Sequence, residues 1–432
     1  MSWGCETEPE FQRELDWIDR FVTEEVEPLD HVLGEVYDVT EARARKLLPP
    51  LKAQVQERGL WACHLGPELG GPGFGQLKLA LMNELLGRSR FAPLVFGCQA
   101  PDSGNAEILA HFGSPAQKEK YLEPLLSGDI VSCYSMTEPH AGADPTLFRT
   151  RAVRDGDDWI LSGEKWFSSN ARWASFLIVM AVTDPDVSPY EGMSMFIVPT
   201  DSPGVEILRN VGVGLEGPEH ASHAHIRYND VRVPGDHLLG APGGAFVIAQ
   251  TRLGGGRIHH AMRAVAQLRK AFDMMCERVL SREVRGGLLG DLQMTQEKIS
   301  DSWTEIEQYR LLVLRTAWRI DQYKDYRKVR RDIAAVKAAT PKVVHDVVLR
   351  AMHLHGALGM SDDMPFSRML LGSVVHGIVD GPTEVHKITV ARQTLREYGP
   401  SEGLFPSAHL PTVKEEARQR FADLLEEQIG NL

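Results

Sequence analysis

The chain has 432 residues, of which 43% are hydrophobic and 25% charged, and its formal net charge is −12. This length is sufficient for a large buried core and predicts two or three structural units. The negative charge argues against a nucleic-acid binder, which needs a basic surface for the phosphate backbone. An acidic protein can still bind an anionic small molecule through a few arginines and backbone N–H groups.

Cysteine usage and the N-terminal segment indicate the compartment. The cysteines are scattered and form no C-x-x-C pair; they are Cys5, Cys63, Cys98, Cys133 and Cys276. This pattern is typical of reduced thiols and not of a disulfide framework or a zinc site. The segment MSWGCETEPEF is acidic where a targeting sequence would be basic, and no apolar run reaches the roughly 20 residues that span a bilayer. We therefore expect a cytoplasmic protein without a membrane span.

Residues 1–130 are predicted to form an N-terminal helical domain. Apolar side chains recur at helical spacing in LDWIDRFVTEEVEPL and LALMNELLGRS, and the Gly/Pro segment ELGGPGFG is a loop between such stretches. In GSPAQKEKYLEPLL, Ser114 is a candidate N-cap, with Pro115 at the first helical position and Gln117 placed to complete a capping box.

A change of pattern near residue 131 predicts a middle β domain over residues 131–245. The runs WILSGEKWFSS, SFLIVMAV, MSMFIVP and HAHIRYNDVRVP are short, rich in β-formers and separated by Gly, Pro and Asp turns.

Helical spacing returns over residues 246–400, the predicted C-terminal helical domain, and continues in a tail helix within residues 401–432. The stretch from GGAFVIAQ to CERVL is one long helix or two close ones, and further helices are expected over 292–326 and 328–358. Pro341 predicts a kink or a restart in the last of these. Helices, a β module and a second set of helices make an α+β fold.

Two polar segments of the β domain are candidates for ligand contact. YSMTEPHAGADP offers hydroxyls and a Gly/Pro loop with free backbone N–H groups, although a plain connecting loop has the same composition. In GEKWFSSNA, the flat faces of Trp166 and Phe167 lie beside the hydroxyls of Ser168 and Ser169. That combination suits a planar heterocycle with polar edges, such as a flavin, and ordinary strand packing is the alternative.

The segment IVDGPTEVHKITVARQ contains a third candidate. Asp380 ends an apolar run and precedes Gly-Pro, where a helix should begin. One interpretation is a helix N-cap. The other is a carboxylate held at the mouth of a cavity, where it can act as a base.

Other common ligand motifs are missing. His259, His260, His353 and His355 have no acidic partner at ligand spacing, and adjacent histidines cannot share one helix face, so we expect no metal site. The chain has no GxGxxG fingerprint after a strand and no GxxxxGK[ST] loop, and LGGGR lies within a helical pattern.

Over about residues 8–400, these segments together resemble the acyl-CoA dehydrogenase family. YSMTEPHAGAD, GEKWFSSN, YNDVRVPGDHLLG, HLHGALG and VDGPTEVHKITVAR are similar to its motifs and occur in the same order. The chain is most similar to the branch that carries D-G-P-x-E-V-H, that of family members 10 and 11, without the kinase-like domain of some eukaryotic members.

The resemblance implies an N-terminal helical domain, a middle β domain and a C-terminal four-helix bundle. It also implies FAD between the β domain and the bundle, with its adenine end reaching a neighbouring subunit of a homodimer or homotetramer. The implied substrate is an acyl-CoA, and the implied electron acceptor is an electron-transfer flavoprotein.

The motifs also imply roles for individual residues. Cofactor contacts are implied for Tyr134, Met136, Thr137, Ala143, Phe167, Ser168, Ser169, Arg282, Gln293, His353, Gly356 and Glu384. Substrate contacts are implied for Ala143, Arg257, Gly381 and Arg392. Asp380 is the implied base, and Arg392 follows it by twelve positions, as in the family. The departures from the pattern are the lost Phe of R-x-x-F-G at residues 282–286, Ala357 for a glycine and Pro382 for a hydroxyl residue.

The implied reaction is the α,β-dehydrogenation of fatty acid β-oxidation. Asp380 would take the α-proton and flavin N5 the β-hydride, giving a trans-2-enoyl-CoA. Many members use Glu, which is one methylene longer, so the backbone or the substrate must shift to compensate. Two alternatives stay open: a flavin oxidase of the same fold, acting on nitroalkanes or acyl-CoAs, and a non-catalytic flavin or acyl-CoA binding protein.

Overall fold

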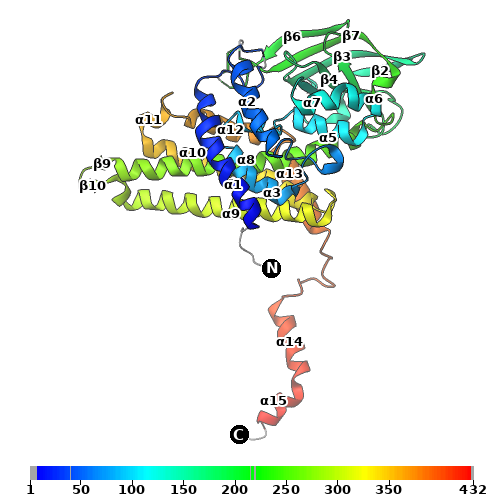
Figure 1. Cartoon of the computed structure of the whole chain (residues 1–432). Coiled ribbons are helices and arrows are strands. Elements are labelled where there is room, and N and C mark those ends of the chain that lie inside the picture. Colours follow the sequence, from blue (N-terminus) through cyan, green and yellow to red (C-terminus); the bar gives the residue numbers. More distant parts are fainter. Residues whose placement is uncertain (1–6, 39, 215, 218–219, 430–432) are drawn as a thin grey trace.

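The computed structural model describes residues 7–38, 40–214, 216–217 and 220–429. A β-sheet unit and a group of short helices both lie against three long helices, and a helical tail projects from the opposite side (Figure 1). The predicted α+β fold class, with helical, β and helical parts in that order, is confirmed. The predicted domain boundaries near residues 130, 245 and 400 remain predictions.

The N-terminal helices form where apolar residues recur at helical spacing. They are α1 Pro9–Phe21, α2 Ala44–Glu57, α3 Gly75–Leu86, α4 Ala92–Val95, α5 Asp102–Phe112, α6 Pro115–Gln117 and α7 Glu123–Ser127. The predicted capping box is confirmed: Ser114 Oγ accepts the Gln117 N–H at 3.2 Å, and Gln117 Oε1 accepts the Ser114 N–H at 3.0 Å.

The β unit is one eight-stranded sheet in the order β6-β7-β3-β1-β4-β5-β8, with β2 beside β3 and β4. Its strands are β1 Ser132–Ser135, β2 Arg151–Asp155, β3 Asp158–Ser169, β4 Phe176–Val182, β5 Met193–Pro199, β6 Val205–Val211, β7 His223–Val233 and β8 Leu238–Leu239. Strands β4 and β5 are buried on both faces, which explains their continuous apolar runs. The antiparallel pairing of β1 with β3 places Tyr134 opposite Ser169, so the two polar segments lie side by side in the interior of the sheet.

The third part is built on long helices. The elements are α8 Ala245–Ser281, β9 Glu283–Val284, β10 Gly287–Leu288, α9 Gln293–Tyr323, α10 Arg330–His355, α11 Ala357–Met360, α12 Phe366–His376, α13 Thr383–Leu395, α14 Leu410–Arg420 and α15 Ala422–Ile429. Helix α8 is a single 37-residue helix. Helix α10 runs through Pro341 without a restart, because packing against α8, α9, α12 and α13 holds the helix on both sides of the proline. Among the described residues, no helix is long and apolar enough to cross a membrane.

A buried ion pair fixes the loop that leaves β1. The Lys165 ammonium donates to Glu138 Oε1 and to the Met136 carbonyl, both at 2.8 Å. Glu138 also accepts the backbone N–H groups of Arg149 at 2.7 Å and Thr150 at 2.9 Å. Both charged side chains are at most 1% exposed, and burial lowers the pKa of Lys165 to about 8. The pair therefore ties the loop after β1 to the middle of β3.

Lys165→Met should lower the free energy of unfolding by roughly 3–5 kcal/mol, because it leaves the Glu138 carboxylate buried without its partner. The matched control is the double variant Lys165→Met/Glu138→Leu, which removes both charges and should recover most of the loss. Urea denaturation measures both. A single variant within about 1 kcal/mol of the parent chain would contradict this role for the pair.

Candidate functional site

Three consecutive glycines in the first third of α8, residues 254–256, mark the place where distant segments meet. Glycine inside a helix costs about 1 kcal/mol relative to alanine, so a run of three needs a packing reason. A Cβ at positions 254, 255 and 256 would lie 3.3, 3.1 and 3.3 Å from side-chain atoms of Tyr326, Glu107 and Asp380. The glycines therefore let three polar side chains from other segments approach the helix closely.

Asp380 lies in the loop between α12 and α13 with an unusual backbone. Its φ is +54° and that of Gly381 is +101°, so both residues occupy the left-handed region. The predicted N-cap role of Asp380 is wrong. The N-cap position of α13 is occupied by Pro382, and no side chain caps the helix. The carboxylate is turned toward α8 instead, and its Oδ2 lies 3.8 Å from His260 Nε2.

Two side chains hold the carbonyl of Asp380. Arg257 Nε donates to it at 2.9 Å, and His386 Nε2 lies 3.2 Å from it. A carbonyl only accepts, so His386 carries its proton on Nε2. Burial lowers the pKa of His386 to about 4, so this ring is neutral at physiological pH. The N–H of Asp380 donates to no other group in the described residues, which leaves it free for a ligand.

A buried lysine on α10 holds the two ends of the same loop. The Lys337 ammonium donates to the carbonyl of His376, at the end of α12, and lies 3.5 Å from the carbonyl of Gly381. The residue is 1% exposed, and burial lowers its pKa to about 8. Lys337 and Arg257 are therefore positive charges placed beside the backbone that carries the Asp380 carboxylate.

Two buried histidines lie on the carboxylate side of the Asp380 loop. The rings of His260 and His376 lie 6.2 Å apart. Burial lowers the pKa of His260 and brings that of His376 to about 3. His260 is thus the imidazole that lies next to the Asp380 carboxylate, and burial favours its uncharged form.

The end of β3 forms an open aromatic and hydroxyl surface. Phe167 has φ +54° and is 41% exposed, and its ring lies 5.3 Å from that of His223. The Ser169 hydroxyl pairs with His223 Nδ1 at 2.8 Å. An exposed aromatic face beside a hydroxyl fits the edge of a planar heterocycle such as a flavin. Ser168 differs, because it is fully buried and its Oγ pairs with Ser135 Oγ at 2.8 Å; this placement does not support a direct flavin contact.

The β1 segment approaches α8 through Tyr134. The Arg252 guanidinium lies 3.9 Å from the centre of the Tyr134 ring, and burial raises the pKa of this phenol to about 12. The carbonyl of Thr137 accepts the Trp166 N–H at 2.8 Å, which joins the loop to β3. Tyr134 and Asp380 thus reach the first third of α8 from distant parts of the chain.

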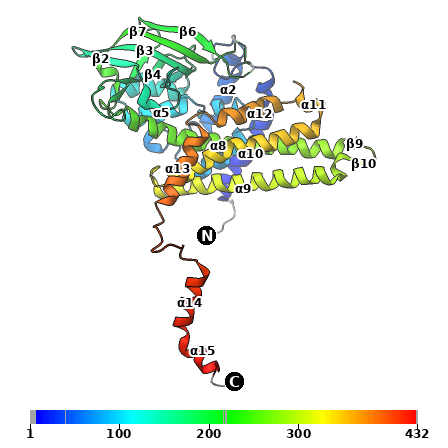
Figure 2. The ribbon, with the colours of Figure 1, turned by 180° about the vertical axis from the view of Figure 1, so that it is seen from behind.

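Other predicted contacts lie far from Asp380. Arg282 directly follows the last residue of α8 and is 25 positions beyond Arg257, which corresponds to about 37 Å along the helix. Gln293 begins α9 beside it, and His353 and Gly356 lie where α10 ends. Figures 1 and 2 show β9, β10 and α11 at one end of the long helices and α13 toward the other. One chain therefore does not bring these residues together with Asp380.

The remaining predicted residues are exposed. Glu384 is in the first turn of α13 and Ala143 in the loop after β1. Arg392 lies nine residues after the first residue of α13, Thr383, which is about 14 Å along the helix. No group of three or more potential metal ligands occurs in the described part of the chain.

Sequence reasoning missed several polar residues around the loop. They are Glu107, Arg252, Lys337, His376 and His386, and His260 was considered only as a metal ligand. One of these residues, Lys337, could have been recognised from the sequence. In IAAVKAAT, Lys337 is a lone charge within an apolar helical stretch, and such a charge needs a buried partner.

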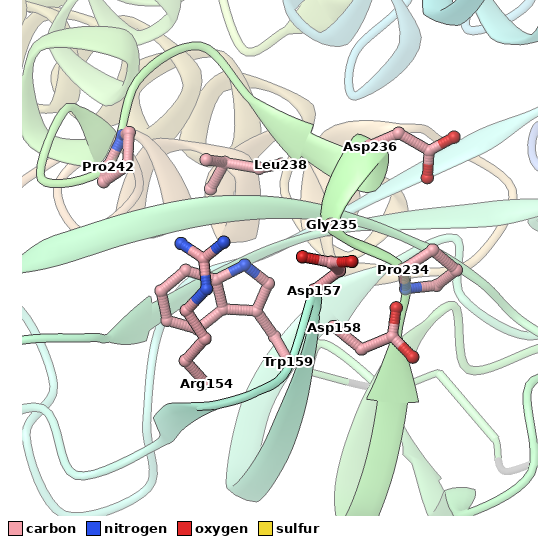
Figure 3. A pocket seen from close by; sticks show the side chains of 9 residues that line it. All are labelled: Arg154, Asp157, Asp158, Trp159, Pro234, Gly235, Asp236, Leu238 and Pro242. Carbon is pink, nitrogen blue, oxygen red and sulfur yellow. The ribbon is translucent and has the colours of Figure 1, made fainter.

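A separate hollow of about 490 Å³ opens on the β unit (Figure 3). Arg154, Asp158 and Trp159 are among its lining residues, and none of its lining residues touches the Asp380 loop or the β3 end described above. This hollow is therefore separate from the candidate site around Asp380.

Comparison with known proteins identifies the family. The acyl-CoA dehydrogenase N-terminal, middle and C-terminal domains match residues 8–129, 133–231 and 243–395. FadE2 of Mycobacterium tuberculosis, assigned as an acyl-CoA dehydrogenase, is 40% identical over 379 residues, which are 85% of this chain and 92% of that protein. Acyl-CoA dehydrogenase family member 11 of Gallus gallus is 39% identical over 388 residues, 88% of this chain but 49% of the relative.

The chain thus spans about half the length of family member 11. A solved structure from Mycobacterium abscessus, assigned to the acyl-CoA dehydrogenases, superposes with a TM-score of 0.84 at 36% identity. That match covers 91% of this chain and 100% of the other. The domain matches, the relatives and the fold agree with the motifs, and the chain belongs to the acyl-CoA dehydrogenase family of FAD-dependent oxidoreductases.

Proposed function

We propose that the protein converts an acyl-CoA thioester into a trans-2-enoyl-CoA and that Asp380 removes the α-proton. The observation that supports this most is the Asp380 loop, where a carboxylate is fixed by a left-handed backbone and by three donors from α8, α10 and α13. Such a preorganised carboxylate is what a proton abstraction needs.

The same residue offers a second group. As the α-proton leaves, negative charge grows on the thioester oxygen and needs a hydrogen-bond donor. The N–H of Asp380 is free for that purpose among the described residues. The left-handed turn and the glycines at 254–256 bring the loop and α8 together, and we propose that this compensates for a side chain shorter than Glu.

FAD fits the surface that β3 presents. When bound, it supplies the acceptor for the β-hydride. We propose that Phe167 and Ser169 contact its ring system and that Tyr134, Met136, Thr137, Ala143 and Glu384 complete this end of the site. Arg282, Gln293, His353 and Gly356 serve the adenine end, but from a second copy, because the α8 geometry separates them from Asp380 in one chain. At least two copies would then share each cofactor.

The finer features of the reaction are also proposals. Arg257 and Gly381 would act near the acyl group, with Arg257 holding the base through its carbonyl, and Arg392 would act farther along α13. We propose an electron-transfer flavoprotein as the acceptor of the electrons. Turnover that depends on oxygen and not on such a protein would instead indicate an oxidase. The unpaired Cys63, Cys98 and Cys133 are consistent with the proposed cytoplasmic location.

Asp380→Asn should retain FAD but lose flavin reduction by roughly 10²–10⁴-fold, because the amide cannot accept the α-proton. The measurement is anaerobic bleaching of the bound flavin by short, long, branched and hydroxylated acyl-CoAs. Asp363→Asn, an exposed carboxylate in the segment before α12, is the matched control and should behave as the parent. Near-normal bleaching by Asp380→Asn would refute the assignment.

The two-copy site can be tested by complementation. Asp380→Asn and Arg282→Glu should each be inactive alone. A mixture refolded or co-expressed in equal amounts should recover roughly a quarter of the parent activity, because half of the pairs are hybrids that contain one intact site. If each chain holds its own complete site, every hybrid carries two damaged sites and the mixture stays inactive.

Lys337 is proposed as a positioning residue for the base. Lys337→Met should lower the flavin reduction rate by about 10–100-fold, because a 1 Å misplacement of a reacting group can cost about 100-fold. In the parent, the rate should fall as pH rises through 8, where the ammonium loses its charge, whereas Lys337→Arg should lose this alkaline limb.

Loss of the folded state would not explain a fall in the flavin reduction rate above pH 8. The pKa of Lys337 is lower in the folded protein than in the unfolded chain, so its contribution to stability rises between pH 8 and the unfolded pKa. Stopped-flow reduction at saturating substrate measures the profile. Identical alkaline limbs in the parent and in Lys337→Arg would contradict the positioning role, while Asp380→Asn tests the base independently.

A further inference from the structure

Two polar groups beside the glycines of α8 have no part in the proposed reaction. A Cβ at position 255 would lie 3.1 Å from Glu107 Oε2, 3.6 Å from the Tyr326 hydroxyl oxygen and 3.6 Å from His259 Cε1. Glu107 belongs to α5, and Tyr326 lies in the segment between α9 and α10. The missing side chain at position 255 therefore lets polar groups from separate elements converge on one side of α8.

Glu107 and Tyr326 do not satisfy their hydrogen-bonding capacity within the described part of the chain. The Glu107 carboxyl makes no hydrogen bond or ion pair there, and the Tyr326 hydroxyl makes no hydrogen bond. His259 differs, because its Nε2 lies 3.2 Å from Gln76 Oε1. An unpaired polar group in a protein interior costs about 1–3 kcal/mol, so two such groups side by side indicate a place that a ligand fills.

These two groups border an interior space that also reaches Asp380. Protein surrounds both side chains closely, and this burial raises the pKa of Glu107 to about 8 and also raises that of the Tyr326 phenol. Neither side chain is fully covered, however, and the same is true of Arg252, Gly256 and Asp380. Asp380 faces position 256 of α8 and Glu107 faces position 255, so the two carboxyl groups border neighbouring parts of one space.

The charges around Glu107 indicate the chemistry that this part of the space suits. With a pKa of about 8, the carboxyl is mainly protonated at physiological pH, so both it and the Tyr326 hydroxyl can donate and accept. Arg252 is the charged neighbour, but its Nε donates to Asn105 Oδ1 at 3.0 Å and its guanidinium lies against the Tyr134 ring.

Three kinds of acyl chain can be compared at this place. An apolar chain leaves Glu107 and Tyr326 without partners, which carries the cost of unpaired buried groups. A chain that ends in a carboxylate brings a second acidic group to Glu107. A hydroxyl group can donate to one of the two residues and accept from the other, so it satisfies both of them.

We propose that Glu107 and Tyr326 select acyl-CoA substrates whose chain carries a hydroxyl group beyond the β-carbon, in preference to apolar chains of the same length. This inference rests on the proposed dehydrogenation at Asp380 and adds the class of substrate. The hydroxyl group is only bound, and no bond to it forms or breaks. A site built to hydrogen-bond a hydroxyl rejects an analogue without it far more strongly than an apolar pocket rejects a missing methylene.

Anaerobic flavin reduction tests the selection, with hexanoyl-CoA compared to hexanoyl-CoA that carries a hydroxyl on each carbon beyond the β-carbon in turn. We expect kcat/KM for the best hydroxylated chain to be at least about 100-fold above that for hexanoyl-CoA. Glu107→Leu should bring the two substrates to within about tenfold of each other, because the buried partner is gone. Glu107→Gln keeps a donor and an acceptor and should retain most of the preference.

Glu119→Leu is the matched control, because this carboxylate is exposed and lies after α6, and it should behave as the parent. A parent protein that reduces its flavin equally well with both kinds of chain would overturn the proposal. Faster reduction by a chain that ends in a carboxylate would also overturn it, since Arg252 would then be the selecting group. Glu107→Leu with the full preference of the parent would show that the carboxyl has only a structural role.

Binding to Asp380→Asn separates this inference from the proposed reaction. The change in flavin absorbance on adding each acyl-CoA measures affinity without turnover, and we expect the hydroxylated chain to bind more tightly than hexanoyl-CoA. If no chain reduces the flavin of the parent but this difference in affinity is found, the proposed reaction fails and the selection stands. Equal affinities would overturn the selection, whatever the parent reduces.

Discussion

The left-handed backbone at Asp380 is the constraint on which the site depends. An aspartate rarely adopts this conformation unless its surroundings enforce it. Here Arg257 and His386 hold its carbonyl, and the buried Lys337 holds the carbonyls on both sides of the turn. The donors come from three helices, so the packing of the bundle determines where the carboxylate lies. This arrangement requires Lys337 to be buried, and burial lowers the pKa of its ammonium group to about 8.

The length of α8 has an equally direct consequence. This 37-residue helix begins beside the β unit, contacts the Asp380 loop within its first third, and is directly followed by Arg282. If the cofactor contacts both regions, as we propose, two copies must share it, because one chain holds the two regions about 37 Å apart along α8.

Sequence patterns predicted the α+β fold class and the Ser114 capping box, because each depends on local periodicity or turn chemistry. The sequence around Asp380 resembles a helix N-cap, because an aspartate precedes Gly-Pro at the expected start of a helix. In the structure Asp380 does not cap α13, and its carboxylate lies beside α8 instead. Pro341 did not restart its helix, because four neighbouring helices hold it. The contact of Lys337 with the Asp380 loop could not be predicted from the sequence, because the two residues are 43 positions apart and only the packing of the helices brings them together.

The central claim is that Asp380 is the base of a site shared by two copies. The most direct measurement is an experimental structure of the FAD-loaded protein with an unreactive acyl-CoA analogue. We expect an Asp380 carboxylate oxygen about 3–3.5 Å from the analogue's α-carbon, with Phe167 of one copy and Arg282 of the other on the same FAD. A different side chain at the α-carbon, or an FAD held entirely within one chain, would contradict it.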